Sequence, residues 1–421
     1  MITVVIILII LLLIWFFWRR EKSVNFDNNA TTEPYREVVS AMSNAAFFGN
    51  PSSFYAKSAA DVVHHLRELV LSVLGKTDHH CIITSGASES NNLMLRGYPG
   101  LVYVSAMEHK TSIECAKKIK APLIHGDTVD LMIADLQKKH AGYAGSLISV
   151  MAVNNETGNM NDMKILDFCR ANGATFHSDI AQFFGKFDRT NPIHRKIASA
   201  DCLSISFHKI HGPVGIGALI IPKNLSLSTQ IEGTQNDGIR GGTENVMACA
   251  GAIEAILRTL HHRTDKNYWL FKMKNELQAI IAKHCDIECF KKYQGQTDLR
   301  AFELSKYAGQ KPFGAVFLSR NAINTVLVSF LYKKPCMKRF CNIEFRKTLA
   351  ENGIKISIGS ACSTNQKGAS HVLHEMRAPF IIRAGAVRFS VGDFNTAEDF
   401  SYFDKVLGAV LKEEPTIERE K

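Results

Sequence analysis

A lysine that follows a predicted strand is the first residue whose position suggests chemistry. His208 and Lys209 come directly after the apolar run 202–207 and before a glycine-rich turn. In a cleft above a sheet, loss of water and nearby cations lower the pKa of a lysine and favour imine formation. Taken alone, this position more often belongs to a solvated surface lysine. Other parts of the sequence must therefore show whether Lys209 takes part in chemistry.

Asp179 and Gln182 stand after another predicted strand, 174–177. A carboxylate at that point could pair with the protonated ring nitrogen of a cofactor and keep the ring an electron sink. The alternative for Asp179 is the N-cap of a helix.

A small-residue turn joins the predicted strand 81–84 to the start of a helix. Gly86, Ala87 and Ser88 can present backbone N–H groups and a hydroxyl to a phosphate there. As an isolated pattern, the same turn is more often a simple helix cap.

Short β-rich runs alternate with helical patterns from about residue 80 onward. This rhythm predicts an α/β fold in which helices cover both faces of a mostly parallel sheet. Ligands of such sheets bind at the carboxyl ends of the strands. The predicted strands are 81–84, 101–107, 146–153, 174–177, 202–207 and 217–221, with helical patterns at 111–120 and 163–172.

Ten ordered blocks give the sequence a family resemblance that covers about residues 25–400. It resembles the cysteine desulfurases of the class V aminotransferase group, in the iron–sulfur-assembly and nitrogenase branch. The blocks are NFDNNATTEPY from Asn25, FGNPSSF from Phe48, TSGASESNN from Thr84, MEHKTS from Met107, VNNETG from Val153, FHSDIAQ from Phe176, SISFHKIHGPVGIGAL from Ser204, GIRGGTEN from Gly238, SIGSACST from Ser357 and VRFSVG from Val387.

The resemblance implies an aspartate-aminotransferase-like fold that binds pyridoxal 5'-phosphate. Lys209 matches the lysine that bonds covalently to the cofactor, and His109 matches the histidine that stacks on its ring and helps proton transfer. Asp179 matches the partner of the pyridine nitrogen. The other matched positions are Asn155 and Gln182 near the phenolic oxygen, Ala87, Ser88, Ser206 and His208 around the phosphate, and Thr243, which completes the phosphate site of the other subunit of a homodimer.

Two further matches imply the reaction. Arg388 matches the arginine that binds the substrate carboxylate, with Asn155 beside it, and a planar guanidinium suits that task. Cys362 matches the loop cysteine whose thiolate takes sulfur from L-cysteine, leaves L-alanine and holds the sulfur as a persulfide. The alternative for Cys362 is an inert buried thiol. An acceptor protein, a scaffold for iron–sulfur assembly or a tRNA-thiolation factor, is then expected to receive the sulfur.

The sequence also departs from the family pattern. It has Val214 where GPKG is usual, Asp393 where SLGR is usual, and no histidine and glycine after NPSS. None of these changes removes a group assigned to chemistry, so they indicate a divergent member.

The first 18 residues, MITVVIILIILLLIWFFW, contain no charge, glycine or proline and are followed by RREK. At ~1.5 Å per residue this stretch gives roughly 27 Å of helix, close to the ~30 Å hydrocarbon layer. A cleaved signal peptide would have a basic region before the run and small residues after it, and a buried or interfacial helix is the other alternative. We expect a single-pass membrane anchor with the catalytic body in the cytoplasm.

The predicted plan has four parts: a transmembrane anchor at 1–18, a linker and N-terminal segment that packs with the small domain at 19–38, a large cofactor-binding domain at 39–264, and a smaller α+β domain at 265–421. Helical patterns at 243–260 and 266–284 mark the passage between the two domains, and 325–330 is strand-like.

The composition limits the classes of protein function that remain possible. The ten cysteines are scattered, which favours reduced thiols over a disulfide framework, and no pair has a sharp zinc spacing, so no metal is predicted. The net charge of +10 suits an anionic membrane or an acidic partner, but no nucleic-acid module is recognised. Two other functions stay open: a selenocysteine lyase or related lyase of this fold, and a non-catalytic membrane-tethered scaffold, against which the complete set Lys209, Asp179, His109, Arg388 and Cys362 argues.

Overall fold

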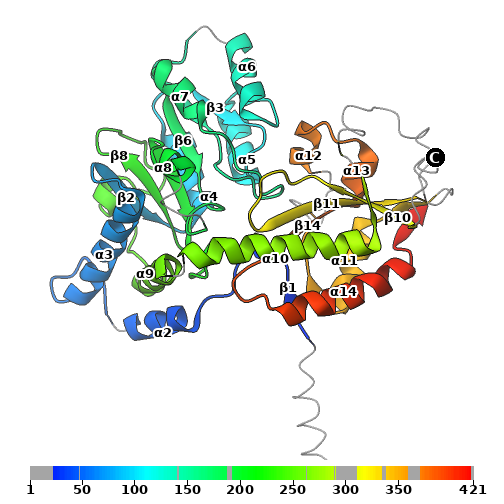
Figure 1. Ribbon diagram of the computed structural model, residues 1–421. Coiled ribbons are helices and arrows are strands. Elements are labelled where there is room, and N and C mark those ends of the chain that lie inside the picture. Colours follow the sequence, from blue (N-terminus) through cyan, green and yellow to red (C-terminus); the bar gives the residue numbers. More distant parts are fainter. Residues whose placement is uncertain are drawn as a thin grey trace, which may run out of the picture.

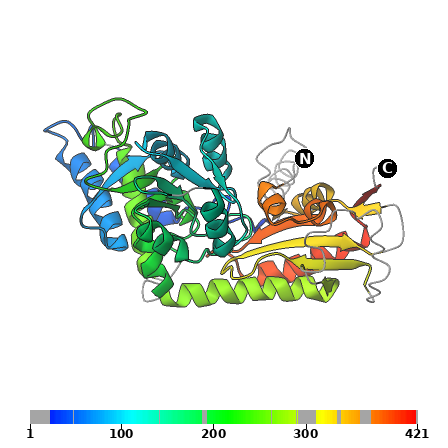
Figure 2. The same cartoon turned by 90° about the horizontal axis from the view of Figure 1, so that it is seen from above.

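Two sheets of different size organise the chain. The computed structural model describes residues 22–46, 48–139, 142–186, 192–261, 263–288, 290, 311–333, 338–358 and 370–418. The larger body surrounds a seven-stranded sheet and the smaller one a four-stranded sheet, and the two lie side by side (Figures 1 and 2).

The large sheet is mixed. Its strand order is β2-β8-β7-β6-β5-β3-β4, and every neighbouring pair is parallel except those that involve β8. The connection from β7 to β8 is too short for the crossover that a parallel pair needs, so β8 turns back antiparallel. The strands are β2 His79–Thr84, β3 Val102–Ser105, β4 Leu123–Ile124, β5 Leu147–Ser149, β6 Thr175–Asp179, β7 Cys202–Ser206 and β8 Gly217–Pro222.

Helices cover both faces of this sheet, as the buried, near-continuously apolar strands predict. On one face, α4 and α5 pack over a core that includes Ile82 and Val104. On the other face, the core includes Ile83 and Ile205 with residues of α3, α7 and α9. The helices of this body are α2 Arg36–Ala45, α3 Lys57–Leu74, α4 Ala87–Gly97, α5 Lys110–Ile119, α6 Val129–Lys139, α7 Lys164–Ala171, α8 Pro192–Ala198 and α9 Val246–His261, with the short turns η1 Phe207–Lys209 and η2 Asn236–Gly238.

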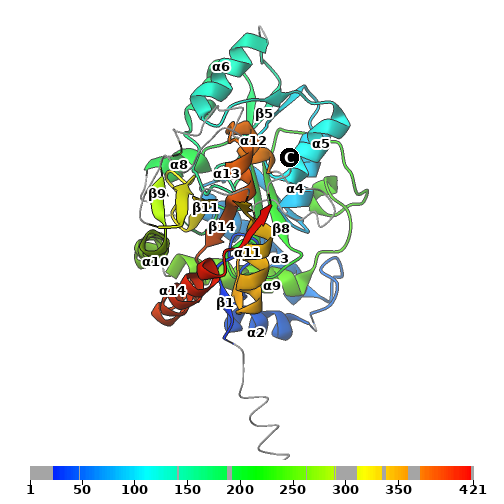
Figure 3. The ribbon, with the colours of Figure 1, turned by 90° about the vertical axis from the view of Figure 1, so that its right-hand side faces the viewer.

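The small sheet has the order β14-β11-β10-β9, and α10 runs along it (Figure 2). Alternate residues of β11 enter two different cores: Val328 and Phe330 join the residues of α10, α11 and α14, while Leu327 and Leu331 join α12, α13 and the large-domain core. Figure 3 shows α12 and α13 on the opposite side of β11 and β14 from α10 and α14. The elements are α10 Arg263–His284, β9 Asp286–Glu288, β10 Phe313–Phe317, β11 Thr325–Tyr332, α11 Asn342–Glu351, α12 His371–Glu375, α13 Phe380–Gly385, β14 Ala386–Ser390 and α14 Ala397–Lys412, with β12 Lys338–Phe340 paired to β15 Thr416–Glu418.

The N-terminal segment joins the two bodies. Strand β1, Val24–Asn25, pairs in parallel with β13, Ile354–Lys355, and the buried Phe26 ring lies 5.4 Å from the Phe400 ring. Residues after β1 then bond to both bodies: the Asn28 N–H donates to the Ser390 oxygen, and the Thr32 N–H donates to the His208 oxygen. The predicted domain boundaries stay predictions.

The predicted membrane anchor, residues 1–18, lies outside the described residues. Among the helices that the structure does describe, none combines the length and the apolar character needed to cross a bilayer.

Candidate cofactor and substrate site

Lys209 lies at the carboxyl end of β7, in the turn η1. Its Nζ donates hydrogen bonds to the backbone oxygens of Asn29 and Ala30, each at 2.6 Å. The N-terminal segment is held at this place by a backbone bond from the Thr32 N–H to the His208 oxygen, 3.0 Å long. The predicted cofactor lysine therefore faces the segment that arrives from the small domain.

Asp179 is the last residue of β6 and is buried. Its Oδ2 accepts from Asn91 Nδ2 at 2.7 Å, and its Oδ1 accepts from the Ala181 N–H at 2.9 Å. These donors fix the carboxylate as an ordered acceptor. The bond from the Ala181 N–H is also the contact that an N-cap makes, although residues 181–186 form turns and no helix. The neighbouring Gln182 is also buried. Its Nε2 donates to the Asn29 backbone oxygen at 2.9 Å, and its Oε1 accepts from Lys186 Nζ at 2.6 Å.

His109 follows β3 and caps the N-terminus of α5. Its Nδ1 lies 2.8 Å from Thr111 Oγ1, which in turn lies 3.1 Å from Ser88 Oγ. Loss of solvent around the ring lowers the pKa of His109, and the nearby Lys209 and His371 lower it further, against an opposing effect of Asp179. The neutral imidazole is therefore the favoured form.

The turn between β2 and α4 leaves N–H groups open at the start of a helix, where an anion can bind. The described residues offer no acceptor to the N–H groups of Ala87 and Ser88, which open the helix. Ser206 Oγ lies near this turn, because a Cβ built at Gly86 would be 3.7 Å from it. His208 lies two residues after Ser206. Burial and the charges of Lys209 and Lys186 lower its pKa to about 4, so its ring is neutral.

The predicted substrate residues meet on the small-domain side. Arg388 is buried within β14, and its Nη2 pairs with Asp27 Oδ1 at 2.5 Å. Its Nη1 donates to the Asn155 backbone oxygen at 2.8 Å, while Arg388 Nε and Asn155 Oδ1 have no partner among the described residues. The guanidinium is thus held in place by two contacts, and its buried Nε–H has no partner among the described residues.

Cys362 lies outside the described residues, but the structure shows both ends of the segment that contains it. On the near side, Ser357 and Arg388 exchange two backbone hydrogen bonds, of 3.1 and 2.7 Å. On the far side, Ser370 Oγ bonds to Glu156 Oε2 at 2.5 Å, and His371 Nε2 lies 2.8 Å from the Glu108 oxygen. The described residues on either side of 359–369 therefore lie close to Arg388 and His109.

Thr243 stands apart. It is exposed on the segment before α9, and no hydrogen bond joins it to the predicted cofactor residues that the structure describes. One chain therefore does not bring this residue to its own site.

Five residues of the site escaped the sequence reasoning: Asn29, Asn91, Thr111, Glu156 and His371. Four of them, all except His371, stand inside the blocks that carried the resemblance, so their position was available but their contacts were not. The hydrogen bonds of Asn29 and His371 join residues more than a hundred positions apart, and no local pattern reveals such contacts.

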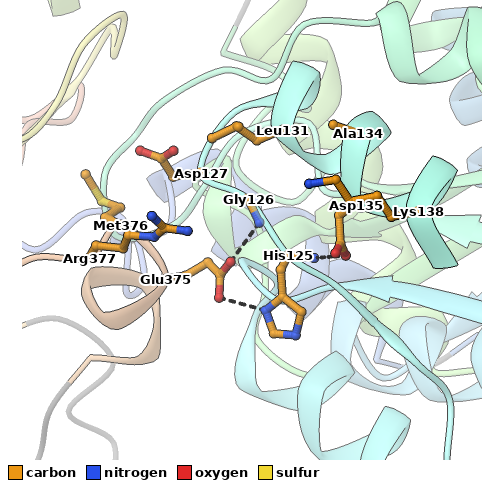
Figure 4. A pocket seen from close by; sticks show the side chains of 10 residues that line it. All are labelled: His125, Gly126, Asp127, Leu131, Ala134, Asp135, Lys138, Glu375, Met376 and Arg377. Carbon is orange, nitrogen blue, oxygen red and sulfur yellow. Dashed lines mark hydrogen bonds and ion pairs between the residues drawn. The ribbon is translucent and has the colours of Figure 1, made fainter. Parts of the chain in front are cut away.

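A separate hollow of about 270 Å³ lies between the β4–α6 segment and the end of α12 (Figure 4). There the Glu375 carboxylate accepts from the Gly126 N–H at 2.7 Å and lies 3.1 Å from His125 Nδ1. These contacts fasten α12, which directly follows the Cys362 segment, to the large domain.

The observed groups fit the pyridoxal phosphate that the resemblance implies. The buried Asn155 Oδ1 needs a partner that no described residue supplies. The phosphate turn also requires glycine, because a Cβ at Gly217 would lie 2.5 Å from the Gly86 Cα. Lys209, Asp179 and the open N–H groups of α4 provide an amine, a carboxylate and an anion site, the three groups such a cofactor needs.

Comparison with known proteins agrees with this assignment. The class-V aminotransferase family model matches residues 24–310. A cysteine desulfurase from Sinorhizobium fredii is 29% identical over 93% of this chain and 97% of its own length, and one from Gluconacetobacter diazotrophicus is 30% identical over 91% and 92%. The fold matches that of a NifS-like protein from Rickettsia africae with a TM-score of 0.75, at 23% identity, over 93% of this chain and all of that one. The chain belongs to the class-V aminotransferase family and is one of its pyridoxal-phosphate-dependent cysteine desulfurases.

Proposed function

We propose that this chain takes the sulfur of L-cysteine onto Cys362 as a persulfide and releases L-alanine. One observation carries the proposal: the short segment Asp27–Ala30 contacts the predicted substrate arginine and the predicted cofactor lysine at once. It also bonds to Gln182 and to the Asn155 backbone. The groups that bind the cofactor and the group that binds the substrate thus share one cleft.

The cofactor would be held at both ends. The N–H groups of Ala87 and Ser88, with the Ser206 and His208 side chains, would bind its phosphate, and Asp179 would pair with its ring nitrogen. When bound, pyridoxal phosphate supplies an electron sink for bonds at the α-carbon of an amino acid. Lys209 would hold it covalently.

Arg388 would bind the carboxylate of L-cysteine. Asp27 occupies the guanidinium in this structure, so the substrate carboxylate competes with a resident carboxylate and must offer better geometry to displace it. Asn155, next to the guanidinium, helps to orient the substrate. This arrangement favours a small α-amino acid over ligands that lack a carboxylate.

Two residues would serve proton transfer. Lys209 would act as the base at the substrate, and the neutral His109 would assist it as a hydrogen-bond donor from its ring. Sulfur transfer itself needs a thiolate at Cys362: the carbon–sulfur bond of L-cysteine breaks, a sulfur–sulfur bond forms at Cys362, and a proton takes the place of sulfur on the departing alanine.

The test is a comparison of the purified full-length chain with Lys209→Ala, Cys362→Ala and the exposed-lysine control Lys223→Ala. We expect a yellow protein that releases alanine and sulfide from L-cysteine, loses its colour in Lys209→Ala, and loses turnover but keeps its colour in Cys362→Ala. Lys223→Ala should match the wild type. Turnover that survives in Cys362→Ala, or a wild type that binds no cofactor, would contradict the proposal.

We further propose a homodimer in which Thr243 of each chain completes the phosphate site of the partner. Its exposure and its separation from the site of its own chain support this arrangement. Sedimentation should give a dimer, and mixing Thr243→Ala chains with Lys209→Ala chains should change cofactor affinity in the hybrid. The persulfide would pass to an acceptor protein for iron–sulfur assembly or tRNA thiolation; in a pull-down, sulfur-loaded protein should transfer labelled sulfur to such an acceptor.

The membrane anchor is also a proposal, supported by the apolar run at residues 1–18. It would place the catalytic body at the cytoplasmic face of a membrane. The full-length chain should resist alkaline extraction from membranes, and a chain without residues 1–18 should be released. Release of both chains would contradict the anchor.

A further inference from the structure

Thr111 contacts His109 through two groups. Its backbone N–H donates to His109 Nδ1 at 3.2 Å, and its Oγ1 lies 2.8 Å from the same nitrogen. The Thr111 hydroxyl also lies 3.1 Å from Ser88 Oγ, in the turn that opens α4. One threonine therefore connects the predicted acid–base histidine to the predicted phosphate turn.

The backbone contact fixes the direction of the other two. A backbone N–H only donates, so His109 Nδ1 must offer its lone pair and the neutral ring carries its proton on Nε2. The Thr111 hydroxyl then donates to Nδ1 and can accept from Ser88. Protonation of Nδ1 would break the backbone contact, which caps α5, and would force the hydroxyl to turn from donor to acceptor.

We propose that Thr111 is a positioning residue that holds His109 as the Nε2–H tautomer and, through Ser88, ties this state to the phosphate-binding turn. The inference rests on the proposed function because it concerns the histidine to which proton transfer is assigned. In this state the Nε2–H is the ring group left to donate a hydrogen bond to a bound molecule, while Thr111 itself touches no substrate.

The charged groups around His109 do not fix the tautomer. Asp179 and Glu156 favour the charged ring, and Lys209 and His371 disfavour it. They act on the total charge of the ring, whereas Thr111 contacts one nitrogen directly. A substitution at Thr111 leaves all four groups in place, so its effect can be measured separately.

The test uses Thr111→Val, which removes the hydroxyl but keeps the branched shape, and Thr111→Ser, which keeps the hydroxyl. Nitrogen-15 spectra of histidine-labelled full-length protein, with and without added pyridoxal phosphate, report the tautomer, and the difference from His109→Asn isolates the His109 signals. We expect an unprotonated Nδ1 in the wild type and in Thr111→Ser. In Thr111→Val the backbone N–H stays in place, so we expect Nδ1 to remain unprotonated, with a His109 pKa higher by roughly half a unit to one unit, the effect of losing one hydrogen bond to the neutral form.

A wild-type ring protonated on Nδ1, or a Thr111→Val ring with an unchanged pKa, would overturn the inference. In turnover assays, the acid limb of the pH profile should move up with the pKa in Thr111→Val and return in Thr111→Ser. The spectra need no turnover, so an inert chain with the expected tautomer counts against the desulfurase proposal alone. An active chain without that tautomer counts against Thr111 alone.

Discussion

The two halves of the site are built differently. On the large sheet, Lys209, Asp179 and His109 each stand at the carboxyl end of a strand, and Asp179 is held by neutral donors from its own domain. On the small-domain side, Arg388 lies inside a strand and is held by Asp27, 361 positions away, through an ion pair. The cofactor half is thus set by the sheet, and the substrate half by the docking of the N-terminal segment.

This difference has a functional meaning. A carboxylate held by two N–H groups keeps its position whether or not a ligand is present. An arginine paired with a resident carboxylate must exchange that partner for the substrate, so its contribution depends on the difference between two similar contacts. We expect substitutions in the first half to affect the rate and substitutions in the second half to affect substrate affinity.

The largest effect is expected for Asp179→Asn. The amide keeps the shape of the side chain but removes the negative charge that would stabilise a protonated ring nitrogen, so kcat should fall by roughly 100-fold or more. Steady-state kinetics measure this, and absorbance confirms retained cofactor. The matched control is Asp201→Asn, which removes the charge of a carboxylate whose described hydrogen bond is to the Phe176 N–H and not to a predicted cofactor residue. A kcat for Asp179→Asn within a few-fold of the control would contradict the assignment.

Arg388→Lys tests the other half. A lysine keeps the charge but loses the planar pair of donors, so KM for L-cysteine should rise by about 10- to 100-fold while kcat changes much less. Arg383→Lys, in the neighbouring helix α13, serves as the control and should leave KM nearly unchanged. A fall in kcat with unchanged KM would instead place Arg388 in the cofactor half.

The same division explains what the sequence could predict. The strand ends before Asp179 and Lys209 are local patterns. The mostly parallel sheet with helices on both faces was predicted from the alternation of β-rich runs and helical patterns and is confirmed, with β8 as the antiparallel exception. The roles of Arg388 and Cys362 came only from the resemblance. The pairing of Arg388 with Asp27 could not be predicted, because periodicity carries no information on contacts between distant segments.

A smaller effect concerns acid stability of the large sheet. His177, two residues before Asp179, is fully buried between Ser149 and Ser204, and burial lowers its pKa to about 3 from the ordinary 6.5. Between these values the unfolded chain binds a proton that the folded chain does not, so stability is lost as the pH falls below about 6.5, by up to ~1.4 kcal/mol per pH unit. Urea denaturation of His177→Gln should show a shallower loss between about pH 7 and about pH 5. Equal slopes in both proteins would rule out this role of His177.

The smallest effect is expected at the contact between α12 and the large domain. Glu375→Ala removes the acceptor for the Gly126 N–H and the contact with His125, which should cost about 1 kcal/mol in the free energy of unfolding. The control is Glu351→Ala on an exposed position of α11, which should change stability by less than about 0.5 kcal/mol. If the two variants unfold alike, the contact does not stabilise the docking of α12.

The most direct test of the central claim is the mass of the peptide that contains Cys362 after the purified protein reacts with L-cysteine. The account predicts a gain of one sulfur atom on Cys362, together with alanine formation, and loss of the gain upon treatment with a reducing thiol. Alanine formed at the wild-type rate with no sulfur on this peptide, or sulfur held only on another cysteine, would contradict it.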